Sequence, residues 1–244
     1  MKRILKLFCL FIFVTTIVGC SSEHSRFLAT HHCKKCDLTS EDFSGINLRG
    51  AFLEKANLSY TDFRKAILIA ANLTRATLTF ADFREADLVG ATLSNGYLWG
   101  VDFRRSNLNR ADLSYANLSE ANFSKAEMSE ANLIGTDLSG AVLRGSILNR
   151  ANLVGAKIIN ANLMMSVLTN TKLVNVNLTG TNLDGADLRG ANLSSANLDG
   201  TSLRGANLAG ANLTDADLEK AIFCETIMPD YVKNDASCIV IARN

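Results

Sequence analysis

Large apolar residues recur at every fifth position from Leu38 to Phe223, with no slip of register. Of these 38 central positions, 30 are Leu and six are Phe, and Met128 and Ile158 complete the set. A small residue stands two positions before the centre, and it is Ala in 24 cases; Asn or Asp stands one position before it in 25 cases. A repeat over most of the chain determines the fold more strongly than local propensity does.

A period of five fits neither of the ordinary secondary structures. In an α-helix, five residues leave successive centres about 140° apart, so no buried stripe forms. In a strand, an odd period sends successive centres to opposite faces. The chain can keep every centre inside only if it turns once per five residues, and four such turns close a square coil of 20 residues.

The Phe and Gly residues support a coil of 20 residues. The six Phe centres are Phe43, Phe63, Phe83, Phe103, Phe123 and Phe223, and every spacing between them is a multiple of 20. Of 16 Gly residues, 14 stand two positions after a centre. We expect these positions to be corners where φ is positive, a conformation that Gly adopts at little cost.

The motif A-(N/D)-L-x-x in this copy number resembles the pentapeptide-repeat family. The resemblance implies an all-β fold, a right-handed quadrilateral β-helix, here of about nine to ten coils. Coils stacked by β-type hydrogen bonds rise about 4.8 Å each, which gives a rod roughly 45 Å long. We expect the repeat domain to span residues 37–228 and a C-terminal cap to span 229–244, where Ile239, Val240 and Ile241 would form a short strand or turn over the last coil.

The N-terminus has the features of a secretory signal. Basic residues are followed by an apolar run from Leu7 to Val18, which is too short to span a bilayer comfortably. The run ends in Ile17-Val18-Gly19-Cys20, which resembles the lipobox of bacterial lipoproteins. The resemblance implies removal of residues 1–19 and lipidation of Cys20. A cleaved signal with a chance Cys is the alternative. Ser21 after the Cys suggests sorting to the outer membrane, and the chain would lie on its periplasmic face.

Residues 20–36 are predicted to hold the lipidated N-terminus, an irregular tether over Ser21–His32 and a Cys-x-x-Cys cap. Export places Cys33, Cys36, Cys224 and Cys238 in an oxidising compartment. Two of the three possible pairings would join opposite ends of the rod, whereas bonded Cys residues need Cα atoms within about 7 Å. We therefore favour the pairs Cys33–Cys36 and Cys224–Cys238, with zinc bound by His31, His32 and the two thiolates, or a redox role, as alternatives.

No combination of catalytic residues stands out in the repeat. All three His residues precede it, and its Asp and Asn residues recur by repeat position, which predicts turn and ladder roles. Removal of Lys2, Arg3 and Lys6 would leave 22 of the 25 basic residues against 24 acidic ones. This balance gives no reason to expect nucleic acid as a partner. We expect no enzyme activity, no cofactor, no metal and no small-molecule substrate.

Two sets of outward residues are candidates for binding. Asp-Phe-Arg recurs at 62–64, 82–84 and 102–104, and neighbouring Lys and Arg residues form a basic ladder beside the acidic one. Paired, solvated charges explain this pattern more simply than a face for anionic ligands or lipid headgroups. Outward aromatic residues gather on another wall, and they predict a partner surface or local packing. They are Tyr60, Phe80, Tyr97 and Trp99.

The sequence therefore leads to two functional hypotheses. The first is a scaffold or rigid spacer, tethered to the bilayer through lipidated Cys20, that binds an unidentified envelope protein. The second is implied by the family resemblance, because some pentapeptide-repeat proteins mimic duplex DNA and act on DNA gyrase. That role needs an acidic rod in the cytoplasm, which the mixed charge and the export signal disfavour.

Overall fold

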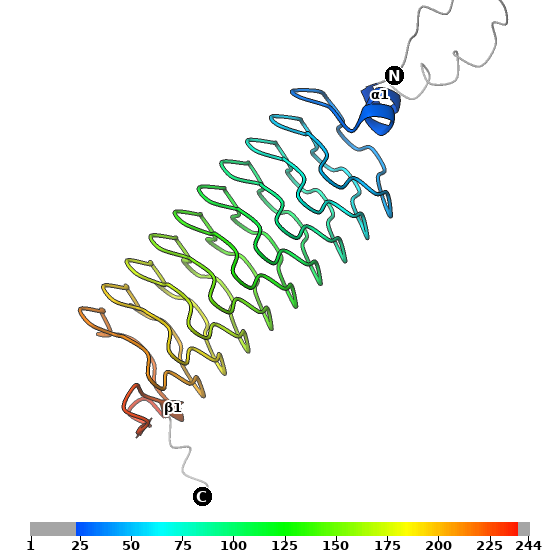
Figure 1. Cartoon of the computed structure of the whole chain (residues 1–244). Helices are drawn as coiled ribbons and strands as arrows, with labels where there is room; N and C mark the ends of the chain where they lie inside the picture. Colours follow the sequence, from blue (N-terminus) through cyan, green and yellow to red (C-terminus); the bar gives the residue numbers. More distant parts are fainter. Residues whose placement is uncertain (1–22, 239–244) are drawn as a thin grey trace, which may run out of the picture.

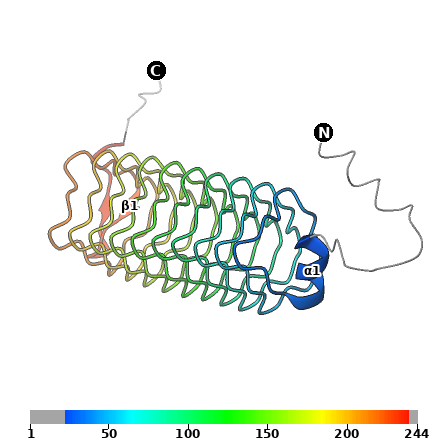
Figure 2. The same cartoon turned by 90° about the horizontal axis from the view of Figure 1, so that it is seen from above.

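The protein is a straight rod of stacked square coils, as the computed structural model shows for residues 23–238 (Figures 1 and 2). Helix α1, Glu23–Thr30, covers the N-terminal end of the rod. Strands β1, Thr226–Ile227, and β2, Lys233–Asn234, form an antiparallel pair at the other end. The signal segment, Cys20 and Ile239–Val240–Ile241 lie outside the described residues.

The coils stack through parallel β-bridges between residues 20 positions apart. The series runs from His32 opposite Phe52 to Asn207 opposite Ile227. Each wall contributes one bridge before the chain turns, so the ladder is continuous along the rod although each strand is only a residue or two long. The square coil is the one that the repeat predicted, and the right-handed quadrilateral β-helix is the fold that the family resemblance implied.

The central residues form a column of buried side chains along the axis. Phe63, Phe83 and Phe103 are fully buried, and their ring centroids lie 4.7 Å and 5.1 Å apart in sequence order. Phe43 and Phe123 extend the stack, with centroid separations of 5.5 Å and 5.0 Å to their neighbours. These separations confirm that residues 20 apart in sequence lie above one another.

The small residues before the centres let the walls approach the axis. Most are buried Ala, and where Thr or Ser replaces Ala the hydroxyl group finds a backbone acceptor. Thr61 Oγ1 donates to the carbonyl of Leu38 at 2.9 Å, and Thr201 Oγ1 donates to the carbonyl of Leu178 at 2.7 Å. Ser106, Ser146 and Ser166 instead donate to the carbonyl three residues earlier in their own coil. The buried hydroxyl groups are therefore paired, either between coils or within one.

The polar residue before each centre and the residue two after it make the turns. The Oδ1 of Asp42 accepts a bond from the backbone N–H of Ser44 at 2.9 Å, and Asn122 does the same for Ser124 at 3.0 Å. From Ser40 to Asp215 the residue at each corner has φ between 54° and 68°, and the 14 corner Gly residues are among them. The turn role of Asn and Asp and the positive φ of these Gly residues are thus confirmed.

The N-terminal end differs from the predicted irregular tether, because Glu23–Thr30 are helical. Phe27 is fully buried, and its ring packs edge-on against Phe43 at 5.3 Å between centroids. Without this contact the first Phe of the core column would face water, so burial of Phe27 favours folding of the segment onto the coil. Three adjacent apolar residues, Phe27, Leu28 and Ala29, in a short polar stretch were too weak a pattern to predict the helix.

Both ends carry a disulfide in the pairing that the sequence favoured. Cys33 is bonded to Cys36 and Cys224 to Cys238, with Cα atoms 5.5 Å and 4.7 Å apart. The nearby histidines have other contacts, since His32 stacks on Phe52 at 4.6 Å and its Nδ1 lies 2.7 Å from the carbonyl oxygen of Thr30. The structure thus gives these residues packing roles at the end of the rod.

Candidate interaction surfaces

The four aromatic residues of the predicted partner surface, Tyr60, Phe80, Tyr97 and Trp99, lie on one wall of the rod and at its corner. We call them the aromatic surface. Tyr60 and Phe80 occupy the same corner in consecutive coils, and Trp99 stands one residue before the next corner of that column. Tyr97 lies on the same wall, two residues before Trp99, with the buried Leu98 between them. The coil period therefore brings residues up to 39 positions apart onto one area a few coils tall.

Three of the four rings are in contact. The ring centroids of Tyr60 and Phe80 lie 5.5 Å apart with planes 30° from parallel, and Phe80 meets Trp99 edge-on at 4.7 Å. Local packing does not bury the rings, because Tyr60 and Tyr97 remain 58% and 49% exposed. Phe80 and Trp99 are 44% and 36% exposed. The residues thus form a contiguous, solvent-facing apolar area, as a binding surface requires.

The backbone beneath two of these rings is in a conformation that bulky residues rarely adopt. Tyr60 and Phe80 have φ of 59° and 55°, where an L-residue is disfavoured by about 1–2 kcal/mol. The next corner of the column is Gly100, and a Cβ there would lie 2.8 Å from Cε1 of Phe80. The Phe80 ring therefore occupies space that only Gly leaves open. The same φ recurs at other non-Gly corners, such as Lys65 and Arg105, so the conformation belongs to the coil and the contact with Gly100 is what distinguishes Phe80.

The wall positions between the corners around the aromatic surface carry no charge. In the two coils before Tyr97 and Trp99 and in the coil after them these positions are small and polar, and they are Asn57, Ser59, Thr77, Thr79, Asn117 and Ser119. Aromatic rings among hydroxyl and amide groups supply large contact area with adaptable hydrogen bonds. Such a surface suits a protein partner better than a highly charged ligand.

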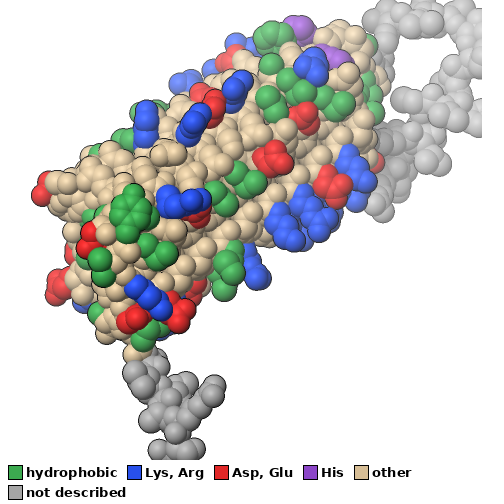
Figure 3. Space-filling model, turned by 60° about the horizontal axis from the view of Figure 1, so that its bottom comes forward, with side chains coloured by type: hydrophobic (Ala, Val, Ile, Leu, Met, Phe, Trp, Pro, Cys, Tyr) green, Lys and Arg blue, Asp and Glu red, His purple; other side chains and the backbone are tan. Residues whose placement is uncertain are grey.

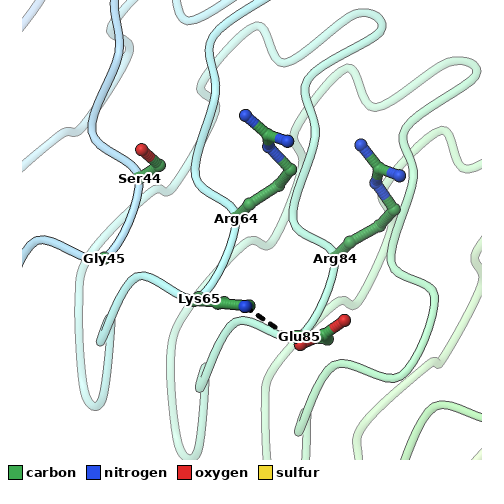
Figure 4. Close-up of a pocket in the computed structure, with 6 residues that line it drawn as sticks. All are labelled: Ser44, Gly45, Arg64, Lys65, Arg84 and Glu85. Atoms are coloured by element: carbon green, nitrogen blue, oxygen red, sulfur yellow. Dashed lines mark ion pairs between the residues drawn. The ribbon is translucent and has the colours of Figure 1, made fainter.

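The adjacent wall carries the predicted ladder of Asp and Arg, here called the Asp–Arg ladder and made of residues 62, 64, 82, 84, 102 and 104 (Figure 4 shows Arg64 and Arg84). Within each coil the guanidinium group binds the carboxylate two residues earlier, and the Nη2–Oδ2 distances are 2.5 Å, 2.6 Å and 2.6 Å. Between coils, Arg64 Nε lies 3.8 Å from Asp82 Oδ2, and Arg84 Nε lies 3.7 Å from Asp102 Oδ2. The arginines are thus largely neutralised by their own wall.

The corner beside the ladder is more basic. Lys65 pairs with Glu85 in the next coil, with Nζ and Oε2 3.8 Å apart (Figure 4). Arg105 and Lys125 follow in the same column, and no carboxylate of residues 23–238 lies within ion-pairing distance of either. Basic and acidic side chains are interspersed on the face that Figure 3 shows. The paired ladder fits the simpler interpretation, solvated charges that stabilise neighbouring coils.

The ladder predicts a defined pH response at Asp62. Hydrogen bonds from the Arg64 side chain hold the pKa of Asp62 below its ordinary value, although partial burial acts in the opposite direction. A carboxyl group with a lowered pKa adds stability that is present above the pKa of the unfolded chain and is lost as pH falls through the pKa of the folded state. We expect Arg64→Gln to raise the pKa of Asp62 toward the ordinary value of an aspartate side chain.

The measurement is an NMR titration of the Asp62 carboxyl carbon in both proteins. Arg110→Gln is the matched control, because it removes an exposed Arg that pairs with Glu130 elsewhere on the rod. The free energy of unfolding of the wild type should fall more steeply below about pH 4 than that of Arg64→Gln. An unchanged Asp62 pKa in Arg64→Gln would contradict the assigned contact.

Two exposed aromatic residues were not singled out from the sequence. Tyr115 is 63% exposed at another corner, and its ring covers Gly135 as Phe80 covers Gly100. Phe52 is 47% exposed and is covered on one side by His32. The sequence pattern that could have pointed to Tyr115 is a bulky residue at a corner position followed 20 residues later by Gly135. Neither residue has a ring contact with the aromatic surface among the described residues.

Three comparisons relate the chain to known proteins. A family model described as pentapeptide repeats matches eight copies, over residues 36–75, 56–95, 86–124, 126–163, 166–200 and 191–228. HetL from the cyanobacterium Nostoc sp. strain PCC 7120 is a pentapeptide repeat protein involved in heterocyst differentiation regulation. Its crystal structure matches with TM-score 0.82 and 34% identity, over 83% of this chain and 91% of HetL.

A second solved structure, trypsin-treated QnrB1, is a plasmid-mediated fluoroquinolone resistance protein. It matches with TM-score 0.50 and 20% identity, over 77% of this chain and 83% of the QnrB1 chain. At this identity the likeness extends to the fold alone. A comparison with curated proteins gives no match.

Proposed function

Because the chain belongs to the pentapeptide-repeat family, whose members are generally structural or interaction proteins, we propose that it is a non-enzymatic scaffold held at a bacterial membrane by lipidated Cys20. The aromatic surface binds a protein of the cell envelope. The rest of the rod sets the position of that surface and keeps it rigid. No reaction, cofactor or small-molecule substrate is part of this proposal.

One observation supports the binding role most directly, the exposed and contiguous rings of Tyr60, Phe80 and Trp99. Aromatic residues contribute disproportionately to the free energy of protein–protein binding, and clusters of them mark the centres of interfaces. Folding alone does not require rings at these corners, since Gly, Asn and Ser serve at equivalent positions such as Gly100, Asn160 and Ser40. The rigid β-helix holds the rings in place before a partner arrives, which lowers the entropic cost of binding.

The anchor would hold the rod close to the bilayer. Cys20 stands three residues before helix α1 begins at Glu23, so the linking segment reaches at most about 10 Å. The helix packs on the first coil and adds no further length to the tether. Among residues 23–238 the structure holds no helix long and apolar enough to cross a membrane. The proposed attachment, a lipid on Cys20, rests on the lipobox-like sequence Ile17-Val18-Gly19-Cys20.

A crosslinking experiment tests the binding surface. A photoreactive phenylalanine analogue at Tyr97 should crosslink one envelope protein in intact cells, and Trp99→Ala or Phe80→Ala should reduce that product about tenfold. Tyr231→Ala is the control, because it removes an exposed aromatic residue at the C-terminal end of the rod, several coils from the aromatic surface. Equal crosslinking in all variants would remove the aromatic surface from the proposal.

Metabolic labelling separates this proposal from the alternative of a gyrase-binding protein. The chain should incorporate a palmitate analogue and fractionate with membranes, and Cys20→Ser should abolish the labelling. An unlabelled pool in the cytoplasm would contradict the lipoprotein assignment. The mixed charge of the rod gives the gyrase role no specific support.

A further inference from the structure

One corner of the rod carries a basic residue in each of three consecutive coils. Lys35, Lys55 and Arg75 stand 20 positions apart with φ of 60°, 61° and 58°, and all three are exposed. Lys34 lies beside Lys35 at the end of the preceding wall. We call these four residues the basic edge. It is distinct from the Asp–Arg ladder, because a whole wall of the rod separates the two.

The basic edge is only partly neutralised by neighbouring side chains. Glu54 accepts both of the nearby ion pairs, with its carboxylate oxygens 2.8 Å from Lys34 Nζ and 3.5 Å from Lys55 Nζ. Among residues 23–238 no carboxylate pairs with Lys35 or Arg75. Like charges stacked at the spacing of β-coils repel one another. A column of three basic residues with a single paired acid is therefore suited to an anionic partner.

The charge of this corner column changes along the rod. Beyond Arg75 its residues are uncharged from Asn95 to Ser195, and the column ends with Asp215. Residues 213–238, at the same end as Asp215, hold two basic and six acidic side chains. The basic residues of the column are thus confined to the three coils nearest the N-terminus. An anionic surface would attract this end of the rod and repel the other.

The proposed anchor belongs to the same end of the rod. The N–H of Asp37, two residues after Lys35, donates to Glu23 Oε2 at 2.6 Å and holds the start of α1 against the first coil. Three positions separate Cys20 from Glu23, so a lipid on Cys20 would keep Glu23 within about 10 Å of the bilayer surface. The basic edge begins in this first coil. Its side chains are therefore within reach of the headgroups.

An exposed apolar ring lies on the wall that ends at the basic edge. Phe52 is 47% exposed, and its ring stacks on His32 with centroids 4.6 Å apart. Lys55 follows three residues later at the corner of the same coil. Figure 3 shows histidine, basic and hydrophobic side chains gathered at this end of the rod. An aromatic ring beside basic side chains is typical of surfaces that bind at the boundary between water and lipid.

We propose that the basic edge binds the anionic phospholipid headgroups of the bilayer that anchors Cys20, with the Phe52 ring at the boundary between headgroups and acyl chains. This inference rests on the proposed lipidation of Cys20. Headgroup phosphates supply the negative charge that the edge lacks, and each Lys or Arg near an anionic surface adds to the attraction. A lipid alone leaves the rod free to swing on its tether, whereas the basic edge turns one wall toward the bilayer. Tyr60 and Phe80 lie at the far corner of the adjacent wall, so they remain accessible to an envelope protein.

Photocrosslinking to lipid tests the inference with the lipidated protein in vesicles. A photoreactive phenylalanine analogue in place of Phe52 should crosslink phospholipid in vesicles of phosphatidylcholine and phosphatidylglycerol. The yield should be at least about tenfold higher than in phosphatidylcholine alone. Salt at about 1 M, where the Debye length is about 3 Å, should remove this difference. The same analogue in place of Tyr97 should crosslink little lipid in either kind of vesicle.

Matched variants separate the basic edge from net charge. Lys35→Gln, Lys55→Gln and Arg75→Gln combined should lower the yield from position 52 at least about tenfold in the anionic vesicles. Lys35→Arg, Lys55→Arg and Arg75→Lys combined should leave it unchanged, because the charges stay in place. A control set removes three basic charges from another corner and should also leave the yield unchanged. It consists of Lys65→Gln, Arg105→Gln and Lys125→Gln.

The outcomes that contradict this inference differ from those that contradict the anchor. Equal yields in the two kinds of vesicle, or equal losses in the basic-edge and control variants, would show that the basic edge does not bind the headgroups. Equal lipid crosslinking in place of Phe52 and of Tyr97 would show that another wall faces the bilayer. Protein that carries lipid on Cys20 by mass spectrometry, sediments with the vesicles and crosslinks no lipid would contradict this inference alone. Protein without that lipid would contradict both proposals.

Discussion

Phe83→Ala should lower the free energy of unfolding by about 3–5 kcal/mol. Phe83 is fully buried, and its ring lies between Phe63 and Phe103 at centroid distances of 4.7 Å and 5.1 Å. The substitution leaves a cavity on the axis of the rod. The surrounding walls cannot collapse into it, because hydrogen bonds to the coils above and below hold their backbone at the β spacing. The loss should therefore lie near the upper part of the range for buried aromatic residues.

Equilibrium urea unfolding followed by circular dichroism measures this loss. Phe83→Leu is the matched control, because Leu occupies most other central positions and the column accepts it; its cost should stay below about 1.5 kcal/mol. Each coil contacts only its neighbours, so a defect in the middle of the rod weakens the coupling between its two halves. A loss under about 1 kcal/mol for Phe83→Ala would show that the walls relax into the cavity.

The architecture could be predicted because one constraint repeats along the whole chain. A period of five with Phe spaced by multiples of 20 is compatible with a square coil and with few other folds, and the stacked rings confirm it. The corner conformation followed from Gly alone, yet Lys, Arg and Glu occupy the same corners with equally positive φ, as at Lys65, Arg105 and Glu120. Stacking between coils overrides the conformational preference of each residue.

The ends were harder to predict, because no period extends into them. Helix α1 is held by tertiary contacts, such as Phe27 against Phe43 and the N–H of Asp37, which donates to Glu23 Oε2 at 2.6 Å, and nothing local in the sequence distinguishes that Phe from an exposed one. The hairpin of β1 and β2 depends on a reversal at Pro229–Val232, whose backbone bonds join Met228 to Val232. Each end of the rod is thus covered by tertiary contacts that occur once in the chain, whereas each coil is formed by contacts that repeat every 20 residues.

The aromatic surface was predictable in part: its position follows from the repeat, and its side-chain contacts do not. The period of 20 brings Tyr60, Phe80 and Trp99 to one area, which the sequence alone could show. The ring contacts, and the dependence of Phe80 on the absence of a Cβ at Gly100, depend on side-chain orientation at a corner. Gly100→Ala is therefore expected to disturb the aromatic surface without entering the core. Gly100→Ala thus gives the crosslinking experiment a variant in which the Phe80 ring is displaced but not removed.

The second large effect on stability is expected at the C-terminal disulfide. Replacing Cys224 and Cys238 by Ser should cost about 3 kcal/mol, because the bond closes a loop with a sequence separation of 14 residues. The Cys33–Cys36 bond spans a separation of only three, so the same replacement there should cost about 2 kcal/mol. The comparison uses the same chemistry at both ends and varies the loop length.

Removal of the Cys224–Cys238 disulfide should also cause local unfolding of the C-terminal end before the whole rod unfolds. Residues 225–238 are held by the hairpin bonds, the disulfide and a few polar contacts, such as the N–H of Glu225 to Oδ1 of Asp235 at 2.7 Å. Hydrogen exchange should therefore rise first in β1 and in the last coil, and only later in the coils around Phe83. Uniformly faster hydrogen exchange along the rod would instead show that the C-terminal cap and the core unfold as one cooperative unit. Equal losses in the free energy of unfolding for the two disulfides would show that loop length does not set their contributions.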